Sequence, residues 1–186
     1  WISERASVLA TDCTFNNTNG TSIIVENMAK LEIKGKSLFS VNEDTRNPLI
    51  VIRNGEVTIG GPNSGDNTTF DNIEKGGIKI ENNGNLNANG CRFQGNTKKA
   101  VFVDCKKGNL EMRKCDFGDN KSCIIVAEGK TFHLEDCGFG ESQSNTIQMK
   151  KIWASNPMII RCAFAGSNDS CIEVKGSSSL IIRNCK

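Results

Sequence analysis

Apolar residues recur along this chain in pairs whose members are separated by one residue. One kind of pair ends in phenylalanine: Cys13/Phe15, Ser37/Phe39, Thr68/Phe70, Cys91/Phe93, Cys115/Phe117, Cys137/Phe139 and Cys162/Phe164, with Cys185 in the first position of a last pair. Successive phenylalanines of this series are 24, 31, 23, 24, 22 and 25 residues apart. The sequence therefore contains an internal repeat of about two dozen residues.

Each repeat holds two further alternations of apolar residues. One comprises Ile23/Val25, Ile50/Ile52, Ile78/Ile80, Val101/Val103, Ile124/Val126, Ile147/Met149 and Ile172/Val174. The other comprises Val8/Ala10, Leu31/Ile33, Val57/Ile59, Leu86/Ala88, Leu110/Met112, Phe132/Leu134, Met158/Ile160 and Leu180/Ile182. A spacing of two residues places both side chains on one face of a strand, and these segments are too short for amphipathic helices. We therefore expect three short strands in each repeat.

Three strands and three corners in 22–25 residues are typical of one coil of a solenoid. The pattern predicts an all-β fold, a single-stranded right-handed parallel β-helix of about seven coils with three short strands per coil. The right hand is expected from the crossover rule for parallel strands. A leucine-rich horseshoe is disfavoured, because its units carry one strand each and are richer in leucine. Residues 1–186 are expected to form one β-helix segment, a fragment of a longer solenoid.

The outward positions of the second strand suggest a contact surface. Ile24, Val51, Phe102 and Ile125 are apolar at positions where a strand face exposed to water is expected to be polar. Trp153 lies at a corner, where an exposed tryptophan is suited to contact a partner, although a lid over its own coil is the simpler interpretation. We therefore take these five residues as candidates for partner contact.

Cysteine is abundant, and six of the nine cysteines occupy the same position in the repeat. They are expected to form an inward ladder, with Ser37 and Thr68 as small substitutes. Buried free thiols pack as small hydrophobic groups, whereas neighbours one coil apart also fall within the Cα range of a disulfide. Both states remain open. The sequence has no CxxC pair and only one histidine, so we expect no metal site and no cofactor.

Five Asn-x-Ser/Thr sequons begin at Asn16, Asn19, Asn67, Asn120 and Asn168. All five lie close to the Phe strand of their coil, so glycans there would line one edge of the solenoid. They favour an extracellular or cell-surface location. The net charge is only +2, and no run of Lys or Arg exceeds two residues, so nucleic acid is not an expected partner. No stretch has the length of apolar sequence needed to span a bilayer.

Candidate catalytic groups are few. Glu111 and His133 are expected one rung apart on the outward side of the third strand, where an acid/base couple competes with a simple surface ion pair. Carboxylates paired as in glycoside hydrolases are not apparent. The sequence contains neither a GxSxG nor an HExxH motif. We therefore expect that the chain is not an enzyme.

Two coils contain an FxxN element, at 93–96 (FQGN) and 117–120 (FGDN), and 76–78 (GGI) is a second short element. In these elements the coils resemble the repeats of polymorphic membrane proteins and related adhesin-like surface proteins. Segments 139–142 and 164–167 lack the asparagine. The resemblance implies a surface-exposed adhesive or structural role and no catalytic residues.

Three functions follow from these observations. The first is an extracellular or cell-surface structural or adhesive β-solenoid, a glycosylated fibre or filament component that assembles end to end. Its expected partners are neighbouring solenoid segments or copies of itself at the uncapped ends, and glycans or another surface protein. The alternatives are a carbohydrate-binding or carbohydrate-active β-helix segment, and an intracellular scaffold.

Overall fold

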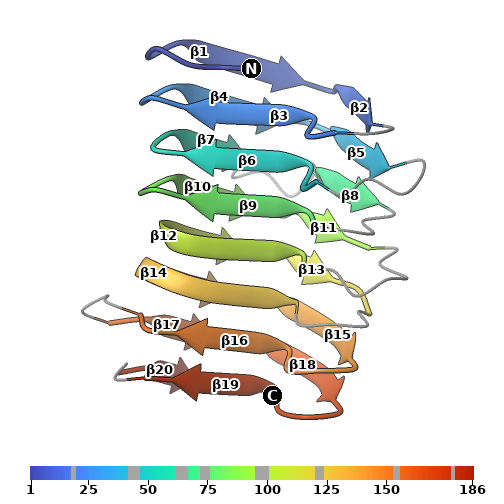
Figure 1. Ribbon diagram of the computed structural model, residues 1–186. Helices are drawn as coiled ribbons and strands as arrows, with labels where there is room; N and C mark the ends of the chain where they lie inside the picture. Colours follow the sequence, from blue (N-terminus) through green and yellow to red (C-terminus); the bar gives the residue numbers. More distant parts are fainter. Residues whose placement is uncertain are drawn as a thin grey trace.

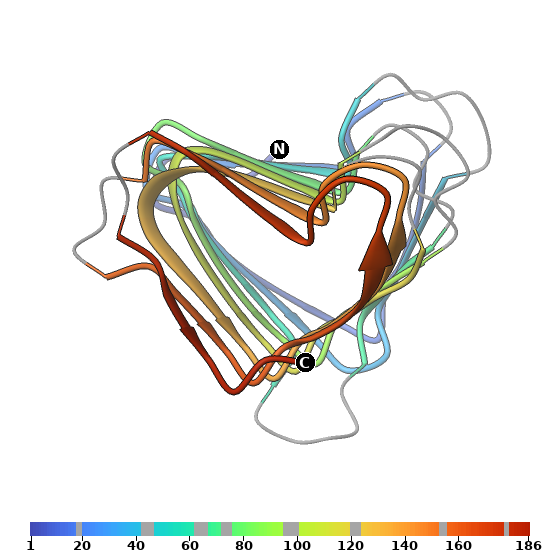
Figure 2. The same ribbon diagram turned by 90° about the horizontal axis from the view of Figure 1, so that it is seen from below.

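The chain is a right-handed parallel β-solenoid in which no described residue is helical. The computed structural model describes residues 1–17, 20–41, 47–61, 67–71, 76–94, 101–119, 124–152, 156–176 and 179–186. Its coils stack along one axis (Figure 1), and the section across that axis is roughly triangular (Figure 2). The predicted fold class is therefore confirmed.

Three faces make up the solenoid, and we name each by its inward side chains. The Phe face contains β2 (Thr14–Asn17), β5 (Leu38–Val41), β8 (Thr69–Asp71), β11 (Arg92–Phe93), β13 (Asp116–Phe117), β15 (Gly138–Ser142) and β18 (Ala163–Ser167). The Ile face contains β3 (Ile23–Glu26), β6 (Ile50–Arg53), β9 (Ile78–Glu81), β16 (Ile147–Lys150) and β19 (Ile172–Lys175). The Leu face contains β1 (Ser7–Thr11), β4 (Lys30–Lys34), β7 (Glu56–Ile59), β10 (Asn85–Asn89), β17 (Met158–Ile160) and β20 (Ile181–Arg183).

Two long strands join the Ile and Leu faces. β12 (Val103–Arg113) and β14 (Ile125–Glu135) begin on the Ile face, bend at the corner and end on the Leu face. The two faces consequently form one 13-stranded sheet, whereas the Phe face is a separate seven-stranded sheet.

Every strand pairs in parallel with the equivalent strand of the next coil. On the Phe face this register aligns Phe93 with Phe70 on one side and with Phe117 on the other. All seven phenylalanines predicted for this ladder stack in one column, with centroids of neighbouring rings 4.5 to 4.9 Å apart. That distance matches the spacing between hydrogen-bonded strands, about 4.8 Å, so the strands and the rings repeat together.

The corner between the Ile and Leu faces depends on small residues. The backbone carbonyl groups of Gly55 and Gly84 accept hydrogen bonds from the first strand residues of the next coil's Leu face. A Cβ atom at Gly129 would lie only 2.3 Å from the carbonyl oxygen of Gly108 one coil away. Successive coils approach so closely here that a larger side chain would force them apart.

A second corner, between the Leu and Phe faces, uses left-handed backbone in every coil. The residues with positive φ at this corner are Asp12, Gly35, Gly60, Gly90, Lys114, Asp136, Arg161 and Asn184. Aspartate, asparagine and glycine adopt this conformation at low cost. Its repetition explains why Gly and Asn separate the predicted strands.

The predicted register is wrong at three places where three apolar residues follow one another. Val103 and Ile124 are buried as predicted, but the strands direct Cys105 inward in place of Val101, and Ile125 and Ala127 inward in place of Val126. On the Leu face the inward residue is Ile159, which pairs with Leu134, whereas Met158 and Ile160 point outward. A continuous apolar run gives no alternation from which to choose a face.

These register shifts remove two of the predicted contact residues from the surface. Phe102 and Ile125 are both 0 % exposed, so the expectation that they point outward is wrong. Phe102 directly precedes the strand and fills the corner, with its ring centroid 5.9 Å from that of Phe93 and 6.2 Å from that of Phe117. The corner thus supplies an inward position that strict alternation does not predict.

The predicted cysteine ladder is present on the inner side of the solenoid. Cys91, Cys115, Cys137 and Cys162 lie on four consecutive coils and are at most 2 % exposed, and every described cysteine is a free thiol. Each thiol donates to a backbone carbonyl two residues earlier, as Cys115 does to Arg113 at 3.3 Å. Because they are buried beside one another, these thiols pack in the core as small hydrophobic groups.

Candidate functional site

The outward side of the Leu face is polar in the middle of the solenoid. Because side chains alternate along a strand, β10 directs Asn85, Asn87 and Asn89 outward while Leu86 and Ala88 enter the core. The neighbouring outward positions are Glu56 and Thr58 on β7, Asn109 and Glu111 on β12, and Thr131 and His133 on β14. Amides and carboxylates from three successive coils therefore share one surface.

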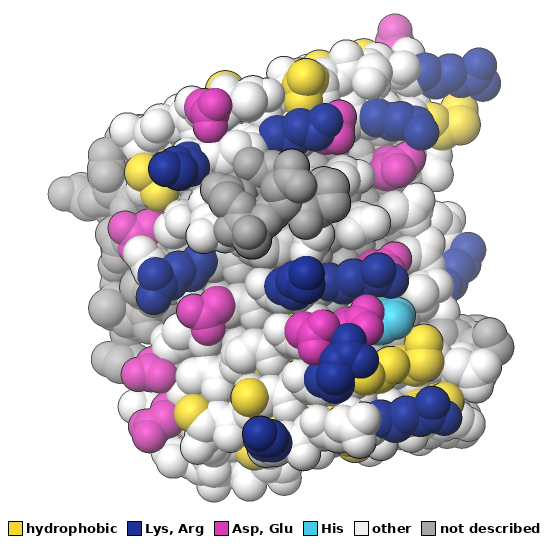
Figure 3. Space-filling view, turned by 180° about the vertical axis from the view of Figure 1, so that it is seen from behind, with side chains coloured by type: hydrophobic (Ala, Val, Ile, Leu, Met, Phe, Trp, Pro, Cys, Tyr) yellow, Lys and Arg dark blue, Asp and Glu magenta, His cyan; other side chains and the backbone are white. Residues whose placement is uncertain are grey.

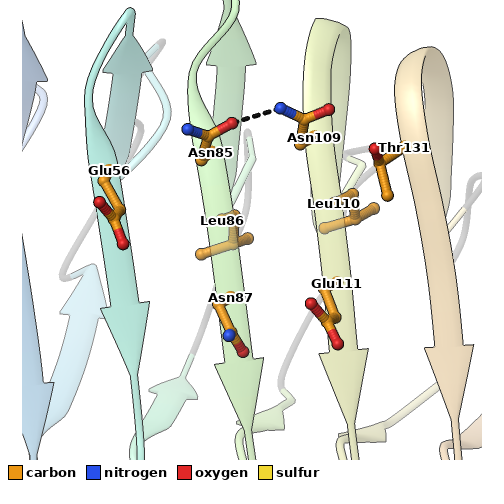
Figure 4. Close-up of a pocket in the computed structure, with 8 residues that line it drawn as sticks. All are labelled: Glu56, Asn85, Leu86, Asn87, Asn109, Leu110, Glu111 and Thr131. Carbon is orange, nitrogen blue, oxygen red and sulfur yellow. Dashed lines mark hydrogen bonds between the residues drawn. The ribbon is translucent and has the colours of Figure 1, made fainter. Parts of the chain in front are cut away.

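This surface is hollowed into a shallow depression of about 290 Å³ (Figure 4). Its lining residues are Glu56, Asn85, Leu86, Asn87, Asn109, Leu110, Glu111 and Thr131. The amide nitrogen of Asn109 donates to the amide oxygen of Asn85 on the adjacent strand, as the dashed line in Figure 4 marks. That bond aligns the two amides. The side-chain nitrogen of Asn85 and the side-chain oxygen of Asn109 have no hydrogen-bond partner among the described residues and can bind a ligand.

Both carboxylates of the depression are held by cations. Glu56 lies 3.0 Å from the Nζ atom of Lys30, and Glu111 lies 2.6 Å from the Nη2 atom of Arg113. The side chains of all four residues are more than a third exposed, so these ion pairs contribute little to stability. These ion pairs orient the carboxylates. Because each pair contributes little free energy, water or a ligand can take the place of the cation at small cost.

A larger charge network borders the depression toward the C-terminal coils. Arg161 contacts Glu135 at 2.6 Å and Asp136 at 2.7 Å, and Arg113 contacts Glu135 at 3.4 Å. The hydrogen bond with Arg161 holds the pKa of Asp136 below its ordinary value, and the same bond raises the pKa of Arg161. Figure 3 shows these charges of both signs gathered beside the single histidine.

The predicted pair of Glu111 and His133 does lie on adjacent rungs of the Leu face. However, the Glu111 carboxylate is paired with Arg113, and the nearest carboxylate to the Nε2 atom of His133 is that of Glu135 at 3.7 Å. The Nε2 atom is itself buried and has no hydrogen-bond partner in the described residues. Each group therefore has its charged partner on its own strand, Arg113 for Glu111 and Glu135 for His133.

The remaining contact candidates have separate positions. Ile24 is half-buried on the outer side of β3. Val51 beside it on β6 is only 4 % exposed, so the expectation that it is available for partner contact is wrong. Trp153 lies outside the described residues. A group of apolar side chains that the sequence interpretation assigned inward lies instead on the outer Leu face, at Met158 and Ile160.

Three of the five sequons begin at described residues. Asn16, Asn67 and Asn168 are exposed, while Asn19 and Asn120 lie outside the described residues. The Asn16 amide oxygen accepts a hydrogen bond from the Ser40 hydroxyl of the next coil. Their use as glycosylation sites stays a prediction.

Within the described part of the chain, no cluster of three or more His, Cys, Asp and Glu side chains is arranged to hold a metal ion. No helix with the length and apolarity needed to cross a bilayer occurs in the same residues.

The fold is a right-handed parallel β-helix, and the outer side of its Leu face is polar and carries a shallow depression. In agreement, the family model described as the right-handed beta helix region matches residues 102–186, the C-terminal coils. No curated protein matches the chain.

Proposed function

We propose that the chain is part of an extracellular or cell-surface β-solenoid with a structural and adhesive role, and that it holds carbohydrate against the polar outer side of its Leu face. The observation that carries this proposal is the row of outward amides on β10 and β12, Asn85, Asn87 and Asn109, between the carboxylates of Glu56 and Glu111.

Amides and carboxylates suit sugar hydroxyl groups for a simple reason. A hydroxyl both donates and accepts, an amide offers two donors and an acceptor, and a carboxylate accepts only. The depression therefore presents both kinds of partner within one shallow surface. Because the depression is shallow and open, it suits an extended polymer whose two ends continue beyond the face. A small molecule, which is usually enclosed by its binding site, fits it less well.

The charges of the site support binding in preference to catalysis. Hydrolysis of a glycoside requires two carboxyl groups with opposite protonation roles that face one bond. Here Glu56 and Glu111 lie two strands apart and each is paired with its own cation. Adhesion through hydrogen bonds needs no such convergence.

Binding to neutral polysaccharides tests the proposal. The purified chain is applied to affinity gels that contain a β-glucan, a mannan or a xylan, together with the variant Asn85→Ala/Asn87→Ala/Asn109→Ala. Loss of three hydrogen-bonding side chains is expected to weaken retention about tenfold or more, since each net hydrogen bond contributes about 1 kcal/mol.

The matched control is Ser40→Ala/Thr69→Ala/Gln94→Ala, which removes three polar side chains from the outer Phe face and is expected to bind as the parent chain does. Absence of binding to all three polymers, or equal retention of the amide variant, would reject the proposal. Release of reducing ends from any polymer would show that the chain hydrolyses glycosides and would overturn the proposed adhesive role.

The proposed location has its own test. Peptides from the chain isolated from its source are expected to carry Asn-linked glycans at Asn16, Asn67 or Asn168, the described sequons that are exposed. Unmodified asparagine at all five sequons would favour an intracellular scaffold instead.

A further inference from the structure

Lysines collect at one corner of the solenoid, between the Ile and Leu faces of the C-terminal half. We define the lysine corner by Lys106, Lys107, Lys130, Lys150, Lys151 and Lys175, all of which are exposed. In the earlier coils the strand ends at this corner carry Glu26, Arg53 and Glu81, whose charges pair with one another, and the turns that follow carry Asn27, Asn54 and Asn82. The positive charge is therefore a property of these coils and not of the corner itself.

The corner contains a depression of about 390 Å³. It is lined by Glu128, Lys150, Lys151, Lys175 and Gly176. Lys150 and Lys175 occupy partner positions on the adjacent strands β16 and β19, so their stems leave the sheet about 4.8 Å apart. Like charges placed directly opposite one another in a sheet repel, and an anion between them removes that repulsion.

The local acidic groups do not neutralise this corner. Lys106 lies 3.5 Å from Asp104, and Lys175 lies 3.0 Å from Glu173. Glu173 also accepts a hydrogen bond from Gln148, which together with Lys175 lowers the pKa of its carboxyl group. Lys107, Lys130, Lys150 and Lys151 form no ion pair within 4.0 Å with any described residue, although the charge of Lys150 also lowers the pKa of Glu173. Six cations thus face three carboxylates, those of Asp104, Glu128 and Glu173.

Two of the lysines occupy backbone positions that do not favour them. Lys107 and Lys151 have φ angles of 58° and 46°, in the left-handed region. Asparagine adopts this region more readily, and Asn54 and Asn82 do so at the equivalent turns. Lys114 and Arg161 adopt the same conformation at the corner between the Leu and Phe faces, so the positive φ places Lys107 and Lys151 at the turn without itself indicating a ligand.

We propose that the lysine corner binds an anionic polysaccharide, a polymer whose carboxylate or sulfate groups recur along its length. The lysines lie on successive coils, so a polymer running along the solenoid axis meets a cation at each rung. This site differs in place and in chemistry from the amide row of the Leu face, and its existence does not depend on the function proposed for that row.

A nucleic acid fits the same corner less well. Proteins that bind single strands combine cations with aromatic side chains on which bases stack. Residues 103–108, 126–131, 148–152 and 173–176, the described part of this corner, contain no aromatic side chain. Isolated lysine ammonium groups bind sulfate and carboxylate as point charges without needing such a platform.

Titration calorimetry of the purified chain tests this inference, with dextran sulfate and polygalacturonate as polyanions and dextran as the neutral probe. Both polyanions, or the one whose anionic group the site prefers, are expected to bind, with an affinity that falls as salt screens the charges. The variant Lys150→Gln/Lys151→Asn/Lys175→Gln is expected to bind about tenfold more weakly, because three exposed ion pairs are lost. Asparagine is chosen at position 151 to suit the positive φ.

The matched control, Lys34→Gln/Lys36→Gln/Lys114→Asn, removes the same number of lysines at the corner between the Leu and Phe faces, and it is expected to keep most of the affinity. Equal weakening by both variants would show attraction to net charge alone and overturn the proposal. Absence of binding to both polyanions, or tighter binding of single-stranded oligothymidylate, would also overturn it.

Discussion

Phe93 and Phe117 stack on successive coils with their ring centroids 4.8 Å apart and their planes 9° from parallel. Each ring also contacts a further phenylalanine on its other side, Phe70 or Phe139. Removal of a ring from the middle of the column therefore deprives two neighbouring rings of a stacking partner. The cavity that it leaves cannot be filled unless the strands move.

Substitution Phe93→Ala is expected to lower the free energy of unfolding by about 3–5 kcal/mol, because a fully buried ring leaves a cavity in a core that relaxes only in part. Urea unfolding followed by circular dichroism measures the change. Phe164→Ala, at a partly buried ring of the same column, is the control and should cost clearly less. Equal losses in both variants would contradict a tightly packed column.

The glycine corner gives a second prediction. In Gly129→Ala the new methyl group would overlap the Gly108 carbonyl oxygen, so we expect the coils to separate locally and the free energy of unfolding to fall by about 1–3 kcal/mol. Gly166→Ala is the matched control, since nothing lies within 4 Å of its added Cβ atom. Thermal unfolding compares the two. A Gly129→Ala chain as stable as the control would refute the close approach.

The buried thiols should be unreactive in the folded chain. Burial raises the pKa of Cys105 to about 12, and the hydrogen bond with Cys115 together with burial raises the pKa of Cys137 to about 12. Since the thiolate is the nucleophile, iodoacetamide at mildly alkaline pH is expected to label Cys13, Cys171 and Cys185, which are partly exposed, long before these two. Peptide mapping by mass spectrometry measures the order. Labelling of Cys137 at the rate of Cys13 would contradict it.

The same thiols make stability depend on alkaline pH. Their folded pKa values exceed the ordinary value of 9.0, so their contribution is complete below pH 9.0 and declines as the pH rises toward 12. The midpoint of urea unfolding should fall over this interval, and Cys105→Ala should reduce that fall. An unchanged slope in the variant would assign the effect to other groups.

At acid pH the ion pair of Arg161 and Asp136 should matter. The pKa of Asp136 lies below its ordinary value of 3.8 in the folded chain, so the pair stabilises the fold above that pH and the contribution is lost as the pH falls further. Asp136→Asn, which suits the positive φ of this residue, is expected to flatten the acid limb of the stability profile. The control is Asp116→Asn, whose carboxylate lies 3.7 Å from Arg92. A steeper acid limb in Asp136→Asn than in the parent would contradict the assigned sign.

The sequence predicts the core well where a single apolar residue stands between polar ones. Phe70, Phe93 and Phe117 are such residues, and all lie in the predicted column. Val101, Phe102 and Val103 instead form a continuous apolar run, and only pairing with Ile78 on the previous coil decides which of them face inward. Register is a property of two strands, so one strand's pattern does not contain it.

The candidate site was predictable only in part. Alternation places Asn87, Glu111 and His133 on the outer Leu face, as expected. The charge network beside them depends on the corner, where Arg161, a residue between two strands, reaches back 25 positions to Asp136. The signal that was available is the recurrence of charged residues at the repeat spacing, here Lys114, Asp136 and Arg161 at equivalent turns.

The strict parallel register of the Leu face has a consequence for how its surface can change. Glu56 and Glu111 stand on strands separated only by β10, so their separation along the axis is fixed at two inter-strand steps, whatever the side chains between them. Insertion of one complete coil would move every group beyond it by one such step and leave it on the same face. The spacing of binding groups along this surface is therefore a whole number of inter-strand steps. The length of a repeating ligand that the surface accommodates depends on the number of coils and not on their individual shapes.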